Sequence, residues 1–182
     1  MARFTLIDPK TATGKAKQLL DAVQHKLGLV PNMTRAMANS PAVLESYLSF
    51  STALAGGQLD PKLREQISLA VAEANMCDYC LSAHTAIGKM VGLSEQDIAA
   101  SRNYQSSGAK SAAALKFAHE IVVRRGELGQ GDVDAARAAG LTDGEIGEVI
   151  ANVAVNIFTN YFNHIAATDI DFPKVQAAKQ VA

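Results

Sequence analysis

Apolar side chains recur along this chain at the three- and four-residue spacing that is typical of helices. The stretch after Pro61 places its apolar residues on one helical stripe: Leu63, Ile67, Ala70, Val71 and Ala74. Alanine is abundant, and segments in which β-branched and polar residues alternate are scarce. The pattern therefore predicts an all-α protein.

Proline, glycine and capping residues indicate where these helices begin and end. A proline after Ser40 and another after Asp60 each favour a helix start, and Gly56-Gly57 and Asn75-Met76 favour helix ends. Capping pairs precede two later helices, namely Ser94 with Asp97 and Thr142 with Glu145. We expect helices near residues 32–39, 41–55, 61–74, 77–91, 112–125 and 143–167, and a short helix after Ser94.

The length and apolar content predict one helical domain over residues 1–182. With 182 residues of which 48% are hydrophobic, the chain can bury one sizeable core. The loop at 106–108 is too short to be a linker between domains. A shift of eighty residues superimposes three pairs and hints at a duplicated helical unit: Glu65 on Glu145, Cys80 on Asn160, and His84 on His164.

The charge balance excludes several classes of partner. The 17 basic residues nearly cancel the 18 acidic residues, so the basic surface that nucleic acids and anionic membranes require is missing. A helix needs about 20 apolar residues to span a bilayer, and no apolar run in the sequence approaches that length. The segment Met1–Asp8 does not resemble a signal peptide. We expect a cytoplasmic protein with neither nucleic acid nor membrane as a partner.

The two cysteines of the chain stand three residues apart and share a helical stripe with His84. Cys77 begins its helix, where unpaired amide groups favour a thiolate, so we expect a lowered pKa there. His84 follows Cys80 by four residues, which brings the two Cβ atoms to about 5–6 Å and supplies Cys80 with a base. The Cα atoms of Cys77 and Cys80 also fall within the roughly 4.4–6.8 Å window that permits a reversible disulfide.

Glu65 interrupts an otherwise apolar stripe on the preceding helix. If the two helices form a hairpin around Asn75, the carboxylate of Glu65 meets the imidazole of His84, fixes its tautomer and raises its basicity. The proposed proton relay runs from Glu65 through His84 to Cys80. Two other interpretations are that both cysteines are buried packing residues, or that they bind zinc together with His84 and Glu65.

The motif of Glu65, eleven further residues, Cys77-Asp78-Tyr79-Cys80 and His84 resembles the active site of the alkylhydroperoxidase D (AhpD) family. That family lies within the carboxymuconolactone decarboxylase superfamily. Segments 29–32, 40–41 and 163–173 resemble its peroxidase-related branch, so the resemblance covers roughly residues 29–173.

The resemblance implies an all-helical fold, homo-oligomers (trimers or hexamers, or dimers in some branches), and thiol-dependent reduction of a small hydroperoxide without a bound cofactor or metal. In the family, the residue that matches Cys80 is oxidised to sulfenic acid, and the residue that matches Cys77 donates a proton and then closes the disulfide. The helix start favours Cys77 as the nucleophile and the neighbouring base favours Cys80. The resemblance decides for Cys80 and implies a thiol or lipoyl-protein reductant.

The chain departs from the well-known peroxidases of the family at Tyr79, where they carry a histidine. Tyr79 is a candidate substrate-binding residue, with packing as the alternative. His164 is a second candidate, with a buried structural histidine as the alternative. The leading function is a thiol peroxidase or disulfide oxidoreductase, and the alternatives are a decarboxylase of the carboxymuconolactone type and a zinc-binding or redox-sensing oligomer.

Overall fold

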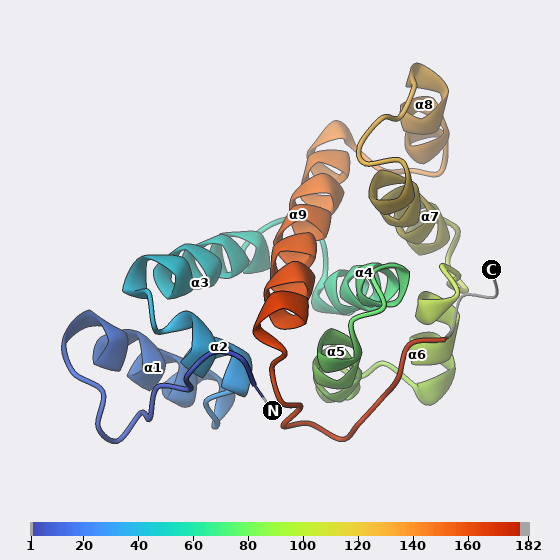
Figure 1. Cartoon of the computed structure of the whole chain (residues 1–182). Helices are drawn as coiled ribbons and strands as arrows, with labels where there is room; N and C mark the ends of the chain where they lie inside the picture. The colour runs from blue at the N-terminus through green and yellow to red at the C-terminus, as the bar shows by residue number, and fades with distance from the viewer. Residues whose placement is uncertain (1, 179–182) are drawn as a thin grey trace.

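The computed structural model of the chain describes residues 2–178, and within this range it contains nine helices and no strand (Figure 1). The prediction of an all-α fold is confirmed. The helices are α1 (Gly14–Leu27), α2 (Asn32–Met37), α3 (Pro41–Ala55), α4 (Pro61–Ala74), α5 (Asp78–Met90), α6 (Glu95–Arg102), α7 (Ala109–Val123), α8 (Gln130–Ala138) and α9 (Asp143–Ala166).

The longest of these helices, α9, runs between two groups of helices (Figure 1). Helices α1, α2 and α3 lie on one side of it, and α4 to α7 lie on the other. Helix α4 contacts α5, α6, α7 and α9, and α9 also contacts α3. This arrangement encloses two apolar cores. The first is built mainly from α4, α7 and α9, and the second joins α1, α2 and α3 to α5 and contains both cysteines.

The turn between α4 and α5 sets the position of the thiols. Asp60 caps the start of α4, with its carboxylate accepting from the backbone N–H of Leu63 at 3.0 Å. After α4 ends, Met76 adopts the left-handed region with φ 52°, and the backbone N–H of Cys77 donates to the carbonyl of Ala72 at 2.9 Å. The chain therefore reverses at the predicted break and begins α5 immediately after Cys77.

Sequence signals located the starts of the other predicted helices to within a few residues, but α1 and α8 were not predicted. The predicted capping boxes of Ser94 with Asp97 and of Thr142 with Glu145 are both present. Ser40 occupies the N-cap position of α3, although its side chain makes no capping hydrogen bond to that helix. The helix expected near 112–125 begins earlier, at Ala109, because Gly108 ends the preceding loop.

The hint of a duplicated helical unit is wrong. Residues 61–90 form two helices joined by a tight turn, whereas the supposed second copy lies within the single continuous helix α9. Glu145 caps the start of α9, while Asn160 and His164 lie near its other end. The alignment of polar residues therefore has no counterpart in the structure.

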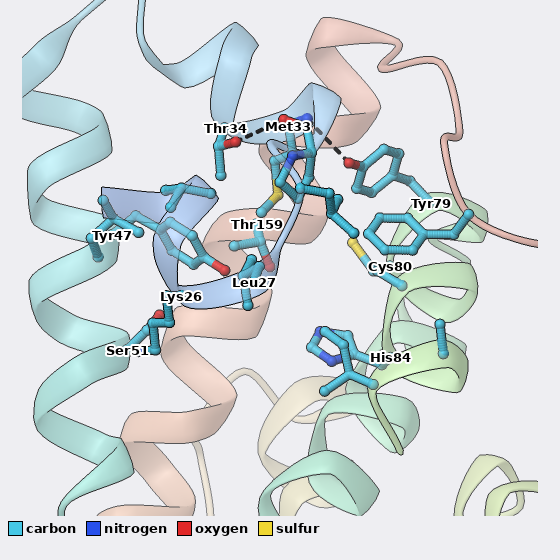
Figure 2. A pocket seen from close by; sticks show the side chains of 18 of the residues that line it. Lys26, Leu27, Met33, Thr34, Tyr47, Ser51, Tyr79, Cys80, His84 and Thr159 are labelled. Carbon is cyan, nitrogen blue, oxygen red and sulfur yellow. Dashed lines mark hydrogen bonds between the residues drawn. The ribbon is translucent and has the colours of Figure 1, made fainter. Parts of the chain in front are cut away.

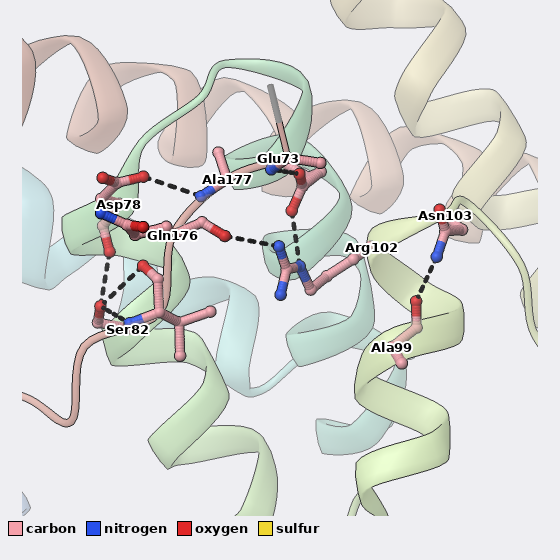
Figure 3. A network of polar contacts seen from close by, with 10 residues as sticks. Glu73, Asp78, Ser82, Ala99, Arg102, Asn103, Gln176 and Ala177 are labelled. Atoms are coloured by element: carbon pink, nitrogen blue, oxygen red, sulfur yellow. Dashed lines mark hydrogen bonds and ion pairs between the residues drawn. The ribbon is translucent and has the colours of Figure 1, made fainter. Parts of the chain in front are cut away.

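The segment after α9 crosses back over α5 and covers its polar side (Figure 3). Ser82 belongs to this polar side, yet its side chain is buried. Its hydroxyl accepts from the backbone N–H of Val175 at 2.9 Å, and the Asp78 carboxylate accepts from that of Ala177, also at 2.9 Å. The polar face is thus paired with backbone groups from the end of the chain rather than with solvent.

An ion pair between α4 and α6 holds the next part of the same segment. The carboxylate of Glu73 accepts from Arg102 and from the backbone N–H of Ala178, both at 2.6 Å. Arg102 also donates to the carbonyl of Gln176 at 2.7 Å (Figure 3). The C-terminal segment therefore holds together α4 and α6, the helices before and after the one that carries the cysteines.

None of the helices in residues 2–178 combines the length and the apolar character that a membrane span requires.

The cap of α4 gives a test of the fold. Replacing Asp60 with alanine removes the hydrogen bond to Leu63, so Asp60→Ala should lower the free energy of unfolding by about 1 kcal/mol in a urea titration. Ser40→Ala is the matched control, because Ser40 makes no such bond to α3 and its loss should be close to zero. Equal losses for the two variants would contradict this account of the caps.

Candidate active site

The two thiols lie together at the start of α5, buried in the second core. Their Sγ atoms are 2.6 Å apart, and both cysteines are free. Cys77 is the N-cap residue, and its sulfur accepts from the backbone N–H of Cys80 at 3.4 Å. The thiol of Cys77 donates to the sulfur of Cys80. The helix start therefore orients Cys77 toward the second thiol.

Glu65 of α4 and His84 of α5 meet across the helix hairpin. Nδ1 of His84 and Oε2 of Glu65 are 2.8 Å apart, and both side chains are largely buried, with 20% and 17% exposed. The contact that the sequence predicted between the two residues is thus present. A carboxylate on Nδ1 fixes the orientation of the ring and leaves Nε2 for other partners.

Burial and charge act in opposite directions on the imidazole. Burial lowers the pKa of His84, because the charged form loses water. The negative charge and hydrogen bond of Glu65 outweigh burial, and the side chain of Asn156 acts in the same direction, so the pKa of His84 is raised overall. A protonated imidazole is therefore favoured beside the thiols.

The environment of Cys80 favours its thiolate. Burial alone raises the pKa of this thiol, but four groups act against burial. They are the thiol of Cys77, the charge of His84, and the side chains of Asn163 and Asn160. Together they bring the pKa of Cys80 to about 7, against an ordinary thiol value of about 8.5.

The expected low pKa at Cys77 is wrong. Its hydrogen bond to Cys80 raises the pKa of the Cys77 thiol, because the donated proton stabilises the neutral form, and burial raises it further. The amide at the helix start lowers the pKa, but by less. The position at the helix start was read correctly from the sequence, whereas the direction of the hydrogen bond between the thiols was not available from spacing.

Two asparagines of α9 complete the surroundings of Cys80. Nδ2 of Asn163 donates to Sγ of Cys80 at 3.3 Å and to Sδ of Met33 at 3.1 Å. Asn160 is fully buried, and its carbonyl oxygen accepts from the side chain of Asn75 at 2.9 Å. The contact of Asn163 with the thiol was not predicted from the sequence. The spacing of the two asparagines on an otherwise apolar helix was the available signal.

A cavity of about 380 Å³ opens onto Cys80 (Figure 2). Cys80, His84 and Tyr79 line it from α5, and residues of α1 and α3 line it on the other side. Cys77 and Glu65 lie outside the lining. A molecule in the cavity can therefore reach the sulfur of Cys80 directly, while Cys77 stays behind it.

Tyr79 lines the cavity, but its hydroxyl is already engaged. The hydroxyl oxygen accepts from the backbone N–H of Met33 at 3.1 Å (Figure 2), and the ring packs edge-on against Phe172 with centroids 5.9 Å apart. Burial and then the charge of Asp171 raise the pKa of Tyr79, so its phenol stays neutral. These contacts give Tyr79 a structural role in joining α5 to α2 and to the C-terminal segment.

His164 lies outside the cavity. It is exposed on α9, and its Nε2 is 2.9 Å from the backbone carbonyl of Asn75, in the turn that precedes Cys77. The structure therefore brings Cys77, Cys80 and His84 together with Glu65 and leaves His164 beside the turn.

The donor set for a zinc site is not assembled among the described residues. Within residues 2–178, no three side chains of His, Cys, Asp or Glu are grouped so that they could hold a metal ion. Glu65, which the zinc interpretation required as a fourth ligand, is hydrogen-bonded to Nδ1 of His84 instead.

Sequence comparison finds a family that covers the centre of the chain. Residues 41–120 match the Carboxymuconolactone decarboxylase family. An uncharacterized protein of Haemophilus influenzae (strain Rd) is 47% identical over 45 residues, which are 24% of this chain and 40% of that protein. The match thus spans less than half of that relative.

Solved structures extend the likeness to nearly the whole chain. The AhpD core of an uncharacterized peroxidase-related protein from Ralstonia eutropha JMP134 has a TM-score of 0.83 at 25% identity, and the match covers 93% of this chain and 92% of the other. A peroxidase-related protein from Silicibacter sp. TM1040 has a TM-score of 0.79 at 24% identity over 92% of both chains. A cysteine-to-alanine variant of the debrominase Bmp8, in complex with 2,3,4-tribromopyrrole, shares the fold with a TM-score of 0.79 at 19% identity over 94% of both chains. The family match over residues 41–120 and the AhpD-like fold together support placing this chain with the AhpD-like proteins of the carboxymuconolactone decarboxylase superfamily.

Proposed function

We propose that this protein is a thiol-dependent peroxidase in which Cys80 is the nucleophile, Cys77 closes the disulfide, and Glu65 with His84 controls the proton. The observation that carries the proposal is the placement of Cys80. Its thiol has a pKa of about 7, it borders a cavity large enough for a substrate, and the sulfur of Cys77 lies 2.6 Å away.

In the first step, the Cys80 thiolate attacks the outer oxygen of a hydroperoxide. The oxygen–oxygen bond breaks, sulfur gains the hydroxyl group as a sulfenic acid, and the alcohol leaves after taking a proton. His84 is a suitable proton source, because Glu65 raises the pKa of its imidazole. Asn163 already donates to the Cys80 sulfur and stabilises the thiolate that reacts.

In the second step, Cys77 attacks the oxidised sulfur of Cys80 and releases water. Two electrons have then moved from the two thiols to the peroxide, leaving a Cys77–Cys80 disulfide. The raised pKa of Cys77 suits this order, because Cys77 keeps its proton until Cys80 has reacted. Two molecules of a small thiol, or the dithiol of one lipoyl protein, then reduce the disulfide and are themselves oxidised to a disulfide.

The AhpD-like fold supports either a peroxidase-related or a decarboxylase-like role. We favour the peroxidase because the contacts around Cys80 all stabilise a thiolate beside a second thiol. A lactone decarboxylase has no need of two thiols in contact. Assay of lactone decarboxylation with the Cys77→Ser protein separates the two, since only the peroxidase requires both thiols.

Reductive dehalogenation is a second candidate, supported by the apolar cavity at Cys80 and by the fold shared with the debrominase. In that reaction the ring carbon gains a proton, the Cys80 thiolate takes the bromine, and Cys77 displaces bromide as the disulfide forms. Each turnover oxidises two thiols and releases one bromide. Bromide release from 2,3,4-tribromopyrrole, measured beside peroxide consumption, decides between the two activities.

The proposed roles of the cysteines predict distinct products with a hydroperoxide. The wild-type protein should lose two hydrogens as Cys77 and Cys80 form a disulfide, measured by intact-protein mass spectrometry. Cys77→Ser should instead accumulate a sulfenic acid on Cys80 that dimedone traps, because the second thiol is missing. Cys80→Ser is the matched control and should stay unlabelled. Labelling of Cys80→Ser alone would reverse the assigned roles, and two unreacted thiols in the wild type would exclude the redox mechanism.

Removing the charge of Glu65 should slow alkylation of Cys80. Glu65→Gln lowers the pKa of His84, the imidazolium beside the thiol is lost, and the pKa of Cys80 rises from about 7. A rise of about one unit reduces the thiolate at pH 7 about fivefold, and the effect should vanish above the ordinary thiol pKa of about 8.5. Iodoacetamide reactivity measured against pH tests this.

Glu45→Gln is the matched control for that experiment, because it removes a half-exposed carboxylate from α3 that pairs with Lys15. Its alkylation profile should follow the wild type. Superimposable profiles for wild type and Glu65→Gln would remove Glu65 from the mechanism.

A further inference from the structure

The cavity at Cys80 has two chemically different ends. Cys80 and His84 occupy the side formed by α5, where the peroxide reacts in the proposed function. Lys26, from the last turn of α1, lines the cavity on the opposite side, which α1 and α3 form (Figure 2). A ligand that extends across the cavity therefore has a thiol at one end and an ammonium group at the other.

The walls between the two ends are mainly apolar. Leu27, Leu29 and Leu48 line the side of α1 and α3, and Ile87 and Met90 line the side of α5. A water molecule occupies about 30 Å³ of liquid, so a cavity of about 380 Å³ has room for far more than hydrogen peroxide. Apolar walls favour a substrate with a hydrocarbon body, because burying its surface is favourable.

Lys26 is an exposed residue that lines the cavity without an acidic neighbour there. None of the described residues in the lining is acidic, and Lys26 has no ion-pair partner within residues 2–178. Nearby Tyr47 stays neutral, because burial raises its pKa to about 12. By contrast, Lys17 near the start of the same helix forms an ion pair with Asp21. An anionic group on the ligand would supply the missing partner.

We propose that the substrate of this site is an amphipathic organic hydroperoxide with an anionic end, such as a medium-chain hydroperoxy carboxylate. Its peroxide lies at Cys80, its hydrocarbon body fills the cavity, and its carboxylate pairs with Lys26. The inference rests on the proposed function. The hydroperoxide is reduced to the hydroxy carboxylate and water while Cys77 and Cys80 give two electrons and form the disulfide.

Matched substrates test the anionic end. The full chain is assayed with ω-hydroperoxydecanoate and with its methyl ester, which has the same peroxide and hydrocarbon but no charge. For the wild type, kcat/KM should be about two- to fivefold higher with the carboxylate than with the ester, which is the effect expected of one partly exposed ion pair. The difference should come from a lower KM. Lys26→Gln should bring this ratio to about one, while Lys17→Gln should retain it, because Lys17 lies outside the cavity lining. A ratio that is the same in wild type and Lys26→Gln would overturn the inference.

A binding measurement separates failure of the inference from failure of the proposed function. Decanoate and methyl decanoate are titrated into the Cys80→Ser protein by calorimetry, with and without Lys26→Gln, where no turnover is required. Tighter binding of decanoate that is lost with Lys26→Gln, together with a wild-type protein that reduces no peroxide, would support the ligand class and refute the peroxidase. Peroxide reduction together with decanoate binding that does not depend on Lys26 would keep the peroxidase and refute the anionic substrate.

Discussion

The hydrogen bond between Glu65 and His84 links the fold of this protein to its chemistry. It joins α4 to α5 across the hairpin, and both partners are largely buried, so each side chain would be left without its charge partner if the other were lost. The carboxylate raises the pKa of the imidazole against the effect of burial, and the charge of His84 in turn lowers the pKa of Cys80. The contact between Glu65 and His84 thereby increases the reactivity of the Cys80 sulfur.

The two cysteines differ in reactivity because they differ in what surrounds them. Cys80 borders the cavity and accepts hydrogen bonds from Cys77 and Asn163, each of which favours its thiolate. Cys77 lies outside the cavity lining and donates its proton to Cys80, which favours its thiol. The hydrogen bond between the thiols thus separates two chemically identical side chains into a nucleophile and a resolving residue.

The sequence predicted the features that depend on local signals. Helix period, the caps at Asp60 and Thr142, and the break at Asn75 follow from neighbouring residues, and the hairpin then brought Glu65 to His84 as expected. Features that depend on distant packing were missed. The burial of Ser82 requires the C-terminal segment to cross α5, and the contact of Asn163 with Cys80 requires α9 to lie against the thiols. Helical spacing cannot show either contact, because both join residues more than eighty positions apart.

The central claim is that Cys80, rather than Cys77, is the thiolate at neutral pH. The most direct measurement is to treat the wild-type protein with a limiting amount of iodoacetamide over a range of pH and to locate the modified residue by peptide mass spectrometry. This account predicts modification of Cys80 with a midpoint near pH 7, while Cys77 stays unmodified through that transition. Modification of Cys77 first, or of both cysteines together at the pH of an ordinary thiol, would contradict it.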